Sequence, residues 1–332
     1  MSDQAHSRDQ AMQTPIVIVH SDKAMQAKQV LQTRHPDLKV HCCETYRDLP
    51  DVISRTRADI VYSVRFAGTP DFPRAALLDS KTVKWVSVGG SGTDHLNPWD
   101  PHKLTVTNAA GVAADMMAQY VLGMMLHFSL RLPQFLEAKR GRRWIAGQVE
   151  PIADKVVLII GLGKTGQAVA RLAKANGMKT LGVRARPQPV ACVDAVHGVS
   201  ELSQLWERAD YVAVCVPLVE STRALISSDA FRAMKEMAVL IDVSRGGVVD
   251  EQALLDALDS DLIRGAALDV FSTEPLPDDH PLWAYENVVI TPHCSSVFEG
   301  WEVKSVEMFS DNLTRYRRGE TLTNVVDPKR GY

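Results

Sequence analysis

Short, continuously apolar runs alternate with helix-compatible segments over the first part of the chain. The run PIVIV begins at Pro15, and similar runs occupy residues 60–64 and 83–88. A strand that is buried on both faces of a parallel sheet shows such a continuous run, rich in β-branched residues, instead of an alternating pattern. The pattern therefore predicts alternating strands and helices that build a parallel sheet.

A second and longer series of the same kind starts at Lys155. Its apolar runs are VVLIIG after Lys155, TLGV at residues 180–183, YVAVCV at 211–216, AVLIDV at 238–243, GAALDV at 265–270 and VVIT at 288–291. Helix-like segments lie between most of them, for example residues 251–260, which follow a candidate N-cap, Asp250. This repetition is typical of a doubly wound sheet with helices on both faces.

The length and the order of these series predict two domains. A chain of 332 residues exceeds what one hydrophobic core usually spans. We expect an α/β protein with two doubly wound parallel-sheet domains, Rossmann-like or flavodoxin-like. Residues 297–317 are again helix-like, and we expect this helix to pack back on the first domain. The predicted division is residues 14–108 plus 294–332 for the first domain and 109–293 for the second.

Residues 112–130 are dense in Ala, Met and Leu and carry almost no charge. This pattern predicts a buried helix. A plain core helix, a connector between domains and a subunit interface remain open alternatives.

The overall composition narrows the class of protein. The formal net charge is −3, so we expect neither a nucleic acid nor a membrane surface as a partner. The five cysteines are odd in number and lack the spacing of metal ligands, which favours a reducing, cytoplasmic location without a bound metal. Residues 1–13 are polar and lack the apolar core of a signal peptide, so we interpret them as a flexible tail.

A glycine-rich motif follows the first strand of the second series. Its residues are Gly161, Leu162, Gly163, Lys164, Thr165 and Gly166, and a helix-like segment follows. The first glycine permits a tight turn, the second lets a pyrophosphate approach the backbone, and the third lets helix and strand pack closely. The helix N-terminus offers N–H groups and partial positive charge. We expect a dinucleotide site here; the alternative is a glycine turn without a ligand.

The end of the next strand indicates which dinucleotide binds. An NAD site places a carboxylate there to accept a hydrogen bond from the ribose 2′-hydroxyl, whereas this chain has Arg184 and Arg186. Two guanidinium groups are suited to a 2′-phosphate. NADP(H) is therefore the preferred cofactor and NAD(H) a secondary one; the alternative is that the arginines are solvated surface charges.

Three polar motifs stand at strand ends of the second series. They contain Asp242 with Arg245, Asp269 with Glu274, and Thr291-Pro292-His293. With these motifs the chain resembles the D-isomer-specific 2-hydroxyacid dehydrogenases, and among them the glyoxylate/hydroxypyruvate reductases. The resemblance implies a substrate-binding Arg245, a catalytic Glu274 and an acid/base His293. It also implies cofactor contacts at Pro217, Thr222, Ser244 and Asp269.

The chemistry of the three residues agrees with these roles. Reduction of a 2-oxo acid requires a cation that holds the carboxylate and polarises the carbonyl, and an arginine does both. It also requires a proton donor that cycles near neutral pH, which a histidine provides, and a carboxylate that orients the imidazole and favours its charged form. Singly, Arg245 could be a structural ion-pair partner, Glu274 a loop charge and His293 a loop histidine. Asp269 has a nearly equal alternative as a buried structural carboxylate.

The first domain contributes further candidates. Gly89 and Gly90 lie in VGGSGTD, which resembles the family's substrate loop, and their N–H groups would bind a carboxylate opposite Arg245. Arg65 stands where some family members touch substrate; a solvated arginine is the equal alternative. Trp144 matches a tryptophan on the family's dimerisation arm, which implies a homodimer with Trp144 near the partner's active site, or a side chain that only packs.

These observations predict NAD(P)H-dependent reduction of a small 2-oxo acid, such as glyoxylate or hydroxypyruvate, to the D-2-hydroxy acid. One alternative is an NAD-dependent D-2-hydroxy acid dehydrogenase for a bulkier substrate. A second is a non-enzymatic, cofactor-sensing scaffold, because one fold can serve several functions.

Overall fold

The computed structural model describes residues 14–65 and 71–332, and it divides them into two compact units. The first comprises residues up to Val112 together with Gly300–Tyr332, and the second comprises Ala113–Glu299. The chain crosses between them at 112/113 and 299/300, whereas the sequence-based boundaries stand at 108/109 and 293/294. The predicted tail, residues 1–13, lies outside the described residues.

The described part of the first unit contains a five-stranded parallel sheet in the order β2-β1-β3-β4-β5. Its elements are β1 (Ile16–His20), α1 (Ala24–Arg34), β2 (Lys39–Cys43), α2 (Leu49–Thr56), β3 (Ile60–Ser63), α3 (Arg74–Leu78), β4 (Trp85–Val88), η1 (Asp94–Leu96), β5 (Thr105–Asn108) and α9 (Trp301–Arg317). This is the flavodoxin-like strand order.

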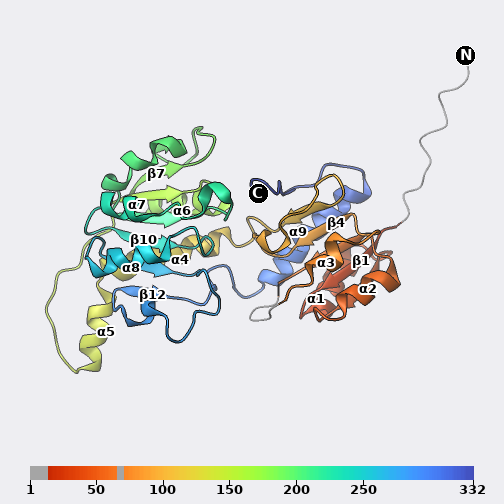
Figure 1. The fold of residues 1–332 in the computed structure, drawn as a ribbon, viewed down its shortest axis with the longest axis horizontal. Helices are drawn as coiled ribbons and strands as arrows, with labels where there is room; N and C mark the ends of the chain where they lie inside the picture. The colour runs from red at the N-terminus through yellow and green to blue at the C-terminus, as the bar shows by residue number, and fades with distance from the viewer. Residues whose placement is uncertain (1–13, 66–70) are drawn as a thin grey trace, which may run out of the picture. The chain divides into compact units, whose positions relative to one another are not determined.

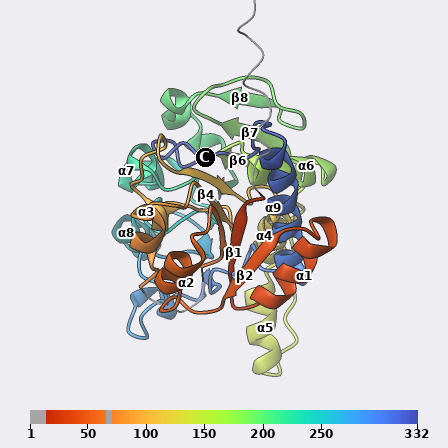
Figure 2. The same ribbon diagram turned by 90° about the vertical axis from the view of Figure 1, so that its right-hand side faces the viewer.

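Helices cover both faces of this sheet, because successive strand residues point to opposite sides. Ile18 and Val61 pack toward α2 and α3, while Val19 and Tyr62 pack toward α1 and α9. Figure 2 shows α1 and α9 side by side on one face and α2 and α3 on the other. The helix that is last in sequence thus completes the core of the first unit.

The second unit contains a seven-stranded parallel sheet in the order β12-β11-β10-β9-β6-β7-β8. Its elements are α4 (Ala114–Ser129), α5 (Leu132–Arg140), β6 (Val156–Ile160), α6 (Lys164–Ala175), β7 (Lys179–Val183), β8 (Ala195–His197), η2 (Val199–Gln204), η3 (Trp206–Arg208), β9 (Tyr211–Val214), η4 (Glu220–Thr222), α7 (Ser228–Ala233), β10 (Val239–Asp242), α8 (Glu251–Asp259), β11 (Gly265–Leu268), η5 (Pro281–Ala284) and β12 (Val288–Ile290). The strands run in the Rossmann order, with one additional strand at the β12 edge.

Two hydrophobic layers flank this second sheet. Ile159 packs on the side of α4 and α6, and Ile160 on the side of α7 and α8. Figure 1 shows the strands at successive levels from β7 to β12, with α5 and its following loop projecting from the unit. The predicted fold class, α/β with two doubly wound parallel sheets, is confirmed.

The differences from the predicted elements have simple physical causes. The sequence pattern did not predict three edge strands, β2, β5 and β8: β2 alternates exposed and buried residues, β5 has the largely polar sequence TVTN, and β8 is only 3 residues long. The helix predicted over residues 297–317 begins only at Trp301, after Gly300 in a left-handed conformation with φ 82°. The helix predicted over residues 112–130 is α4, and the Asp250 cap accepts a hydrogen bond from the Ala253 amide at 3.1 Å.

No helix in the described ranges has both the length and the apolar character that crossing a membrane requires.

Candidate functional site

The loops at the carboxyl edge of the second sheet carry most of the predicted site residues. The strand order reverses direction between β6 and β9, and open parallel sheets bind ligands at such a switch point. The loops after β6, β7, β9, β10 and β11 all leave the sheet at this edge, because every pair of neighbouring strands is parallel.

The loop after β6 requires two of its three glycines on steric grounds. Gly161 has φ +97°, and a Cβ there would lie 2.7 Å from the Cys215 carbonyl oxygen. A Cβ on Gly166 would lie 1.9 Å from the Gly161 carbonyl oxygen. At Gly163, by contrast, no atom lies within 4 Å of an added Cβ. Gly163, the second glycine of the motif, therefore leaves open space for a ligand to approach the backbone.

The N-terminus of α6 is suited to a phosphate group. Gly163 and Lys164 are exposed, Thr165 is half-buried, and the first amide that bonds within the helix belongs to Gln167. The side chain of Leu162 is buried at 2% exposure and packs against Gly182. The amides of Gly163, Lys164 and Thr165 therefore have no hydrogen-bond acceptor among the described residues.

Two arginines follow β7. Arg184 is half-buried and Arg186 is exposed, and the described residues provide no hydrogen-bond or ion-pair partner for either side chain. Residues 184–191 contain no carboxylate. This turn offers positive charge where an NAD site would need an acceptor.

The loop after β9 is held by one hydroxyl group. Thr222 Oγ1 donates to the Pro217 carbonyl oxygen at 2.7 Å and accepts from the Val219 amide at 2.9 Å. Pro217 and Thr222 are both half-buried. The loop lies beside the glycine motif, since the Cys215 carbonyl oxygen leaves no room for a side chain at Gly161.

A buried carboxyl group organises the loop after β10. Asp242 is 2% exposed and accepts from the Ser244 amide at 2.9 Å and from Ser244 Oγ at 2.5 Å. Burial raises the pKa of Asp242 to about 7, although the hydrogen bonds from Ser244 oppose this shift. Arg245 follows directly, and its guanidinium donates to the Ser244 carbonyl at 2.7 Å.

Glu274 and His293 form a hydrogen-bonded pair. The Nδ1 atom of His293 lies 2.9 Å from Glu274 Oε2, and Glu274 Oε1 accepts from the Phe271 amide at 3.0 Å. Burial alone would raise the pKa of Glu274, but these hydrogen bonds and the charges of His293 and Arg245 outweigh it and lower the pKa. The two side chains remain 35% (His293) and 30% (Glu274) exposed. The pair is therefore open to solvent on one side, with the positive charge of Arg245 acting on it.

A second buried carboxylate fixes the loop that carries His293. Asp269 is fully buried and accepts from Thr291 Oγ1 at 2.6 Å, the Cys294 amide at 2.8 Å and the Ser295 amide at 2.9 Å. His293 lies between these contacts with φ 51°, a left-handed conformation that is uncommon outside glycine. Asp269 thus holds residues 291–296, hereafter the 291–296 loop, in the turn that presents the imidazole.

Tyr120 supports the same loop from α4. Its hydroxyl lies 2.8 Å from Thr291 Oγ1. The sequence alone did not indicate a role for Tyr120 or for the Thr291 hydroxyl. The one available signal is a tyrosine in an otherwise apolar helix, because a buried phenol needs a polar partner.

The first unit carries the remaining predicted residues. Gly89 is buried at the end of β4, its amide donates to the Ser63 carbonyl at 2.9 Å, and Gly90 is exposed. Arg65 is exposed after β3, immediately before residues 66–70, which lie outside the described residues. The structure brings Arg245, Glu274, His293 and the cofactor candidates to one edge of the second sheet, whereas Gly89, Gly90 and Arg65 belong to the other unit. Trp144 is fully exposed.

Comparison with known proteins gives consistent matches. Residues 122–295 match the family model described as D-isomer specific 2-hydroxyacid dehydrogenase, NAD binding domain. A glyoxylate reductase of Korarchaeum cryptofilum is 35% identical over 229 residues, which are 67% of this chain and 69% of that protein. The human glyoxylate reductase/hydroxypyruvate reductase is 32% identical over 248 residues, 72% of this chain and 76% of that protein.

A solved structure matches almost the whole chain. It is a D-isomer specific 2-hydroxyacid dehydrogenase from Xanthobacter autotrophicus Py2 in complex with NADPH and MES. The match has a TM-score of 0.84 and 30% sequence identity, and it covers 96% of this chain and 100% of that one.

Proposed function

Because the chain belongs to the D-isomer specific 2-hydroxyacid dehydrogenase family, we propose that it reduces a small 2-oxo acid, glyoxylate or hydroxypyruvate, to the D-2-hydroxy acid with NADPH. The family assignment confirms the resemblance found in the sequence and makes the chain an NAD(P)-dependent enzyme of 2-hydroxy acids. The choice of substrate, the preference for NADPH and the role of His293 are the proposal.

The observation that carries the proposal is the hydrogen bond between His293 and Glu274 next to the charge of Arg245. These residues follow three different strands, β12, β11 and β10, and share no local structural reason to meet. A histidine oriented by a carboxylate beside an arginine is the arrangement that carbonyl reduction requires.

Each residue has a distinct task in the proposed reaction. Arg245 binds the substrate carboxylate and polarises the adjacent carbonyl. Since Nδ1 of His293 is engaged by Glu274, its Nε2 gives the proton to the carbonyl oxygen. Glu274 stabilises the protonated imidazole before transfer and keeps the ring oriented. The nicotinamide supplies the hydride when it is bound.

The residues of the β6–α6 turn fit a dinucleotide. The exposed first turn of α6 and the open space at Gly163 would hold the pyrophosphate. Arg184 and Arg186 would hold the 2′-phosphate of NADPH. Support for this preference comes from two cationic side chains without partners among the described residues and from the absence of a carboxylate at residues 184–191.

We further propose a homodimer that uses α5 and the loop after it. Large exposed hydrophobic side chains concentrate there: Leu130, Leu132, Leu136, Trp144, Ile145 and Val149. Figure 1 shows this segment projecting from the second unit. An apolar patch of this kind typically marks a protein interface, and a second copy of the chain is the partner that the resemblance implies. Trp144→Ala should lower the molar mass measured by light scattering to that of a monomer, whereas Trp283→Ala, a control at another exposed tryptophan, should not.

All five cysteines are free thiols, and Cys42 and Cys43 are adjacent in one strand. Free thiols persist in a reducing compartment. This supports the proposed cytoplasmic location.

The test is the loss of absorbance at 340 nm when the purified chain is mixed with NADPH or NADH and with glyoxylate, hydroxypyruvate, pyruvate or phenylpyruvate. We expect turnover to be fastest with NADPH and either glyoxylate or hydroxypyruvate. Arg184→Gln combined with Arg186→Gln should raise the KM for NADPH and leave the KM for NADH nearly unchanged, with Arg208→Gln as the control. Oxidation of neither cofactor by any acid would contradict the proposed function, and an NADH preference would contradict the role of the two arginines.

A further inference from the structure

Three successive carbonyl groups of the loop at residues 89–92, hereafter the 89–92 loop, are bound by protein donors. The Gly89 carbonyl accepts from Ser305 Oγ at 2.7 Å, and the Gly90 carbonyl accepts from the Ala109 amide at 2.9 Å. The Ser91 carbonyl accepts from Asn108 Nδ2 at 2.6 Å. The loop is thus attached to its own unit by its acceptors.

This attachment determines where the amides point. In a trans peptide the C=O of one residue and the N–H of the next point in opposite directions. The N–H groups of Gly90, Ser91 and Gly92 are therefore directed away from the anchoring side, and they have no acceptor among the described residues. Gly90 and Ser91 are exposed. Adjacent, unpaired amides of this kind form an anion-binding surface.

The first anchor in this series depends on a second hydroxyl. Tyr62 donates to Ser305 Oγ at 2.9 Å, which leaves the Ser305 proton for the Gly89 carbonyl. Tyr62 and Ser305 are each 1% exposed, so water does not replace either bond. Burial also raises the pKa of Tyr62 above its usual range, so the phenol keeps its proton.

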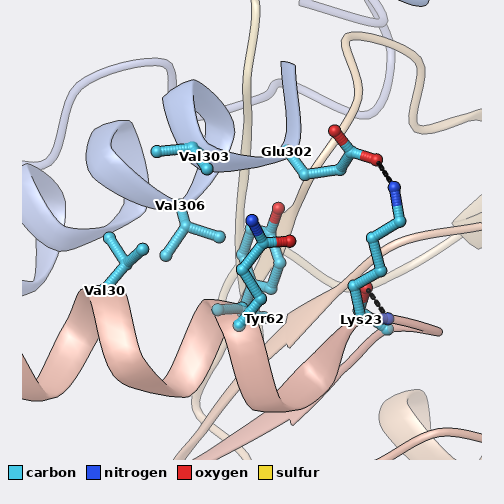
Figure 3. Close-up of a pocket in the computed structure, with 9 residues that line it drawn as sticks. Lys23, Val30, Tyr62, Glu302, Val303 and Val306 are labelled. Carbon is cyan, nitrogen blue, oxygen red and sulfur yellow. Dashed lines mark hydrogen bonds and ion pairs between the residues drawn. The ribbon is translucent and has the colours of Figure 1, made fainter. Parts of the chain in front are cut away.

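Packing around this hydroxyl pair holds α9 in place. Figure 3 shows Tyr62 in the space between α1 and α9, with Lys23 bound to Glu302 at the N-terminal end of α9 and Val30 and Val306 facing each other. Ser305 lies one position before Val306 on the same helix. Ser305 therefore lies on a stretch of α9 that is held by an ion pair at Glu302 and by an apolar contact at Val306.

Gly89 is required because of the same tyrosine. A Cβ on Gly89 would lie 2.7 Å from Tyr62 Oη and 2.7 Å from Val64 Cγ2. At Gly90 no atom lies within 4 Å of an added Cβ. The close approach of the Gly89 backbone to Tyr62 is thus specific to the anchored residue.

We propose that Tyr62 and Ser305 are positioning residues that orient the Gly89–Gly90 peptide so that the Gly90 amide binds the substrate carboxylate. The inference rests on the proposed function and on the expectation from the sequence that this glycine loop binds the carboxylate of the 2-oxo acid. It adds residues of β3 and of the C-terminal helix α9 to the determinants of substrate affinity, although neither side chain contacts substrate.

The test compares steady-state kinetics of Ser305→Ala, Tyr62→Phe and the double variant with glyoxylate at saturating NADPH. We expect the KM for glyoxylate to rise about 2- to 10-fold, as expected for the loss of one hydrogen bond, with kcat and the KM for NADPH nearly unchanged. Because Tyr62 acts through Ser305, the double variant should match Ser305→Ala instead of multiplying the two effects. Tyr62→Phe keeps the aromatic ring in the core, so it provides the test even if Ser305→Ala does not fold.

Ser310→Ala is the matched control. Ser310 is a buried serine on the same helix, and its hydroxyl lies 3.0 Å from His35 Nε2, not near the 89–92 loop. This variant should keep the KM for glyoxylate of the unmodified enzyme. An equal rise in KM for Ser310→Ala, or an unchanged KM for both Ser305→Ala and Tyr62→Phe, would overturn the inference while the proposed function stands. Failure of the unmodified chain to oxidise NADPH with any 2-oxo acid would remove both.

Discussion

The 291–296 loop and the 89–92 loop are held by opposite halves of the peptide group. In the first, the carboxylate of Asp269 accepts from the amides of Cys294 and Ser295. In the second, neutral donors bind the carbonyl groups, and the amides of Gly90, Ser91 and Gly92 have no protein partner in the described ranges. In the 291–296 loop the N–H groups are hydrogen-bonded within the protein, whereas in the 89–92 loop they remain available to a ligand.

The difference matches the tasks that we propose for the two loops. The 291–296 loop has to present one side chain, the His293 imidazole, and the two acceptor oxygens of a buried aspartate are an effective clamp for its backbone. The 89–92 loop has to present its own backbone amides to an anion. A carboxylate clamp would occupy these amides and would also repel the anion. The choice of anchoring group therefore indicates whether a loop acts through its side chain or through its amides.

The largest expected effect comes from removing the side chain that the 291–296 loop presents. His293→Ala should lower kcat by about 10² to 10⁴-fold, because the proton donor is lost. Binding of NADPH, measured by fluorescence titration, should remain. His102→Ala, at an exposed histidine of the first unit, is the control. A rate equal to that of the unmodified enzyme would mean that the proton comes from another group.

The pH dependence of stability should distinguish a buried carboxyl anchor, Asp242 of the loop after β10, from the neutral anchors of the 89–92 loop. Burial raises the pKa of Asp242 from 3.8 to about 7, so between these values the folded chain binds more protons than the unfolded chain. The free energy of unfolding should therefore fall as pH rises through this window, by at most about 1.4 kcal/mol per pH unit, and become level above it. Ser305 and Asn108 do not titrate there, so the anchors of the 89–92 loop should contribute no slope.

Urea unfolding of the unmodified chain and of Asp242→Asn between pH 4 and pH 8 measures this contribution. The variant should have a flatter profile in the window, while Asp278→Asn, at an exposed aspartate, should keep the original slope. Identical profiles for all three proteins would show that Asp242 is ionised well below neutral pH.

Asp269→Asn weakens the clamp of the 291–296 loop with little change in volume. An amide nitrogen would replace one acceptor oxygen and face donors, so we expect the free energy of unfolding to fall by about 1.5 to 3 kcal/mol. Turnover should fall more than the affinity for glyoxylate, because the imidazole loses its orientation and the 89–92 loop is untouched. Kinetics and urea unfolding on the same preparation check both expectations. A variant with a changed KM and unchanged kcat would contradict the division of tasks.

Gly89→Ala and Gly90→Ala form the finest comparison, within one loop. The added methyl group meets Tyr62 and Val64 at residue 89 and nothing at residue 90. Gly89→Ala should lower the free energy of unfolding by about 1 to 3 kcal/mol and raise the KM for glyoxylate. Gly90→Ala should change stability by no more than about 0.5 kcal/mol. Equal destabilisation of both variants in urea unfolding would show that contact with Tyr62 does not require the glycine.

The fold could be predicted from the sequence where strands are buried on both faces. The continuous apolar runs at β1, β6 and β10 are unambiguous, because each of these strands lies inside its sheet between two helical layers. The edge strands β2, β5 and β8 lack this signal because they are short or contain polar residues, whereas the edge strand β12 has an apolar run and was predicted. The two series of alternating strands and helices were sufficient to predict the fold class.

The candidate site could be predicted only where a motif stands at a strand end. Glu274 and His293 follow adjacent parallel strands, so their motifs indicated a common edge before any distance was known. Tyr62 and Ser305 are separated by 243 positions, and their contact depends on how α9 is set against the sheet. A hydroxyl group in a buried strand indicates that a hydrogen-bond partner is needed, but the sequence does not show which residue that partner is.

The placement of α9 has a consequence for the order in which the chain folds during its synthesis. Domains commonly fold one after another as they leave the ribosome, beginning with the N-terminal one. Here one face of the first sheet is covered by Val306, Phe309 and Leu313, which are translated after the entire second unit. The second unit can therefore reach its native state while the first still exposes an apolar face. The Gly89 carbonyl receives its Ser305 partner only after the whole second unit has been translated.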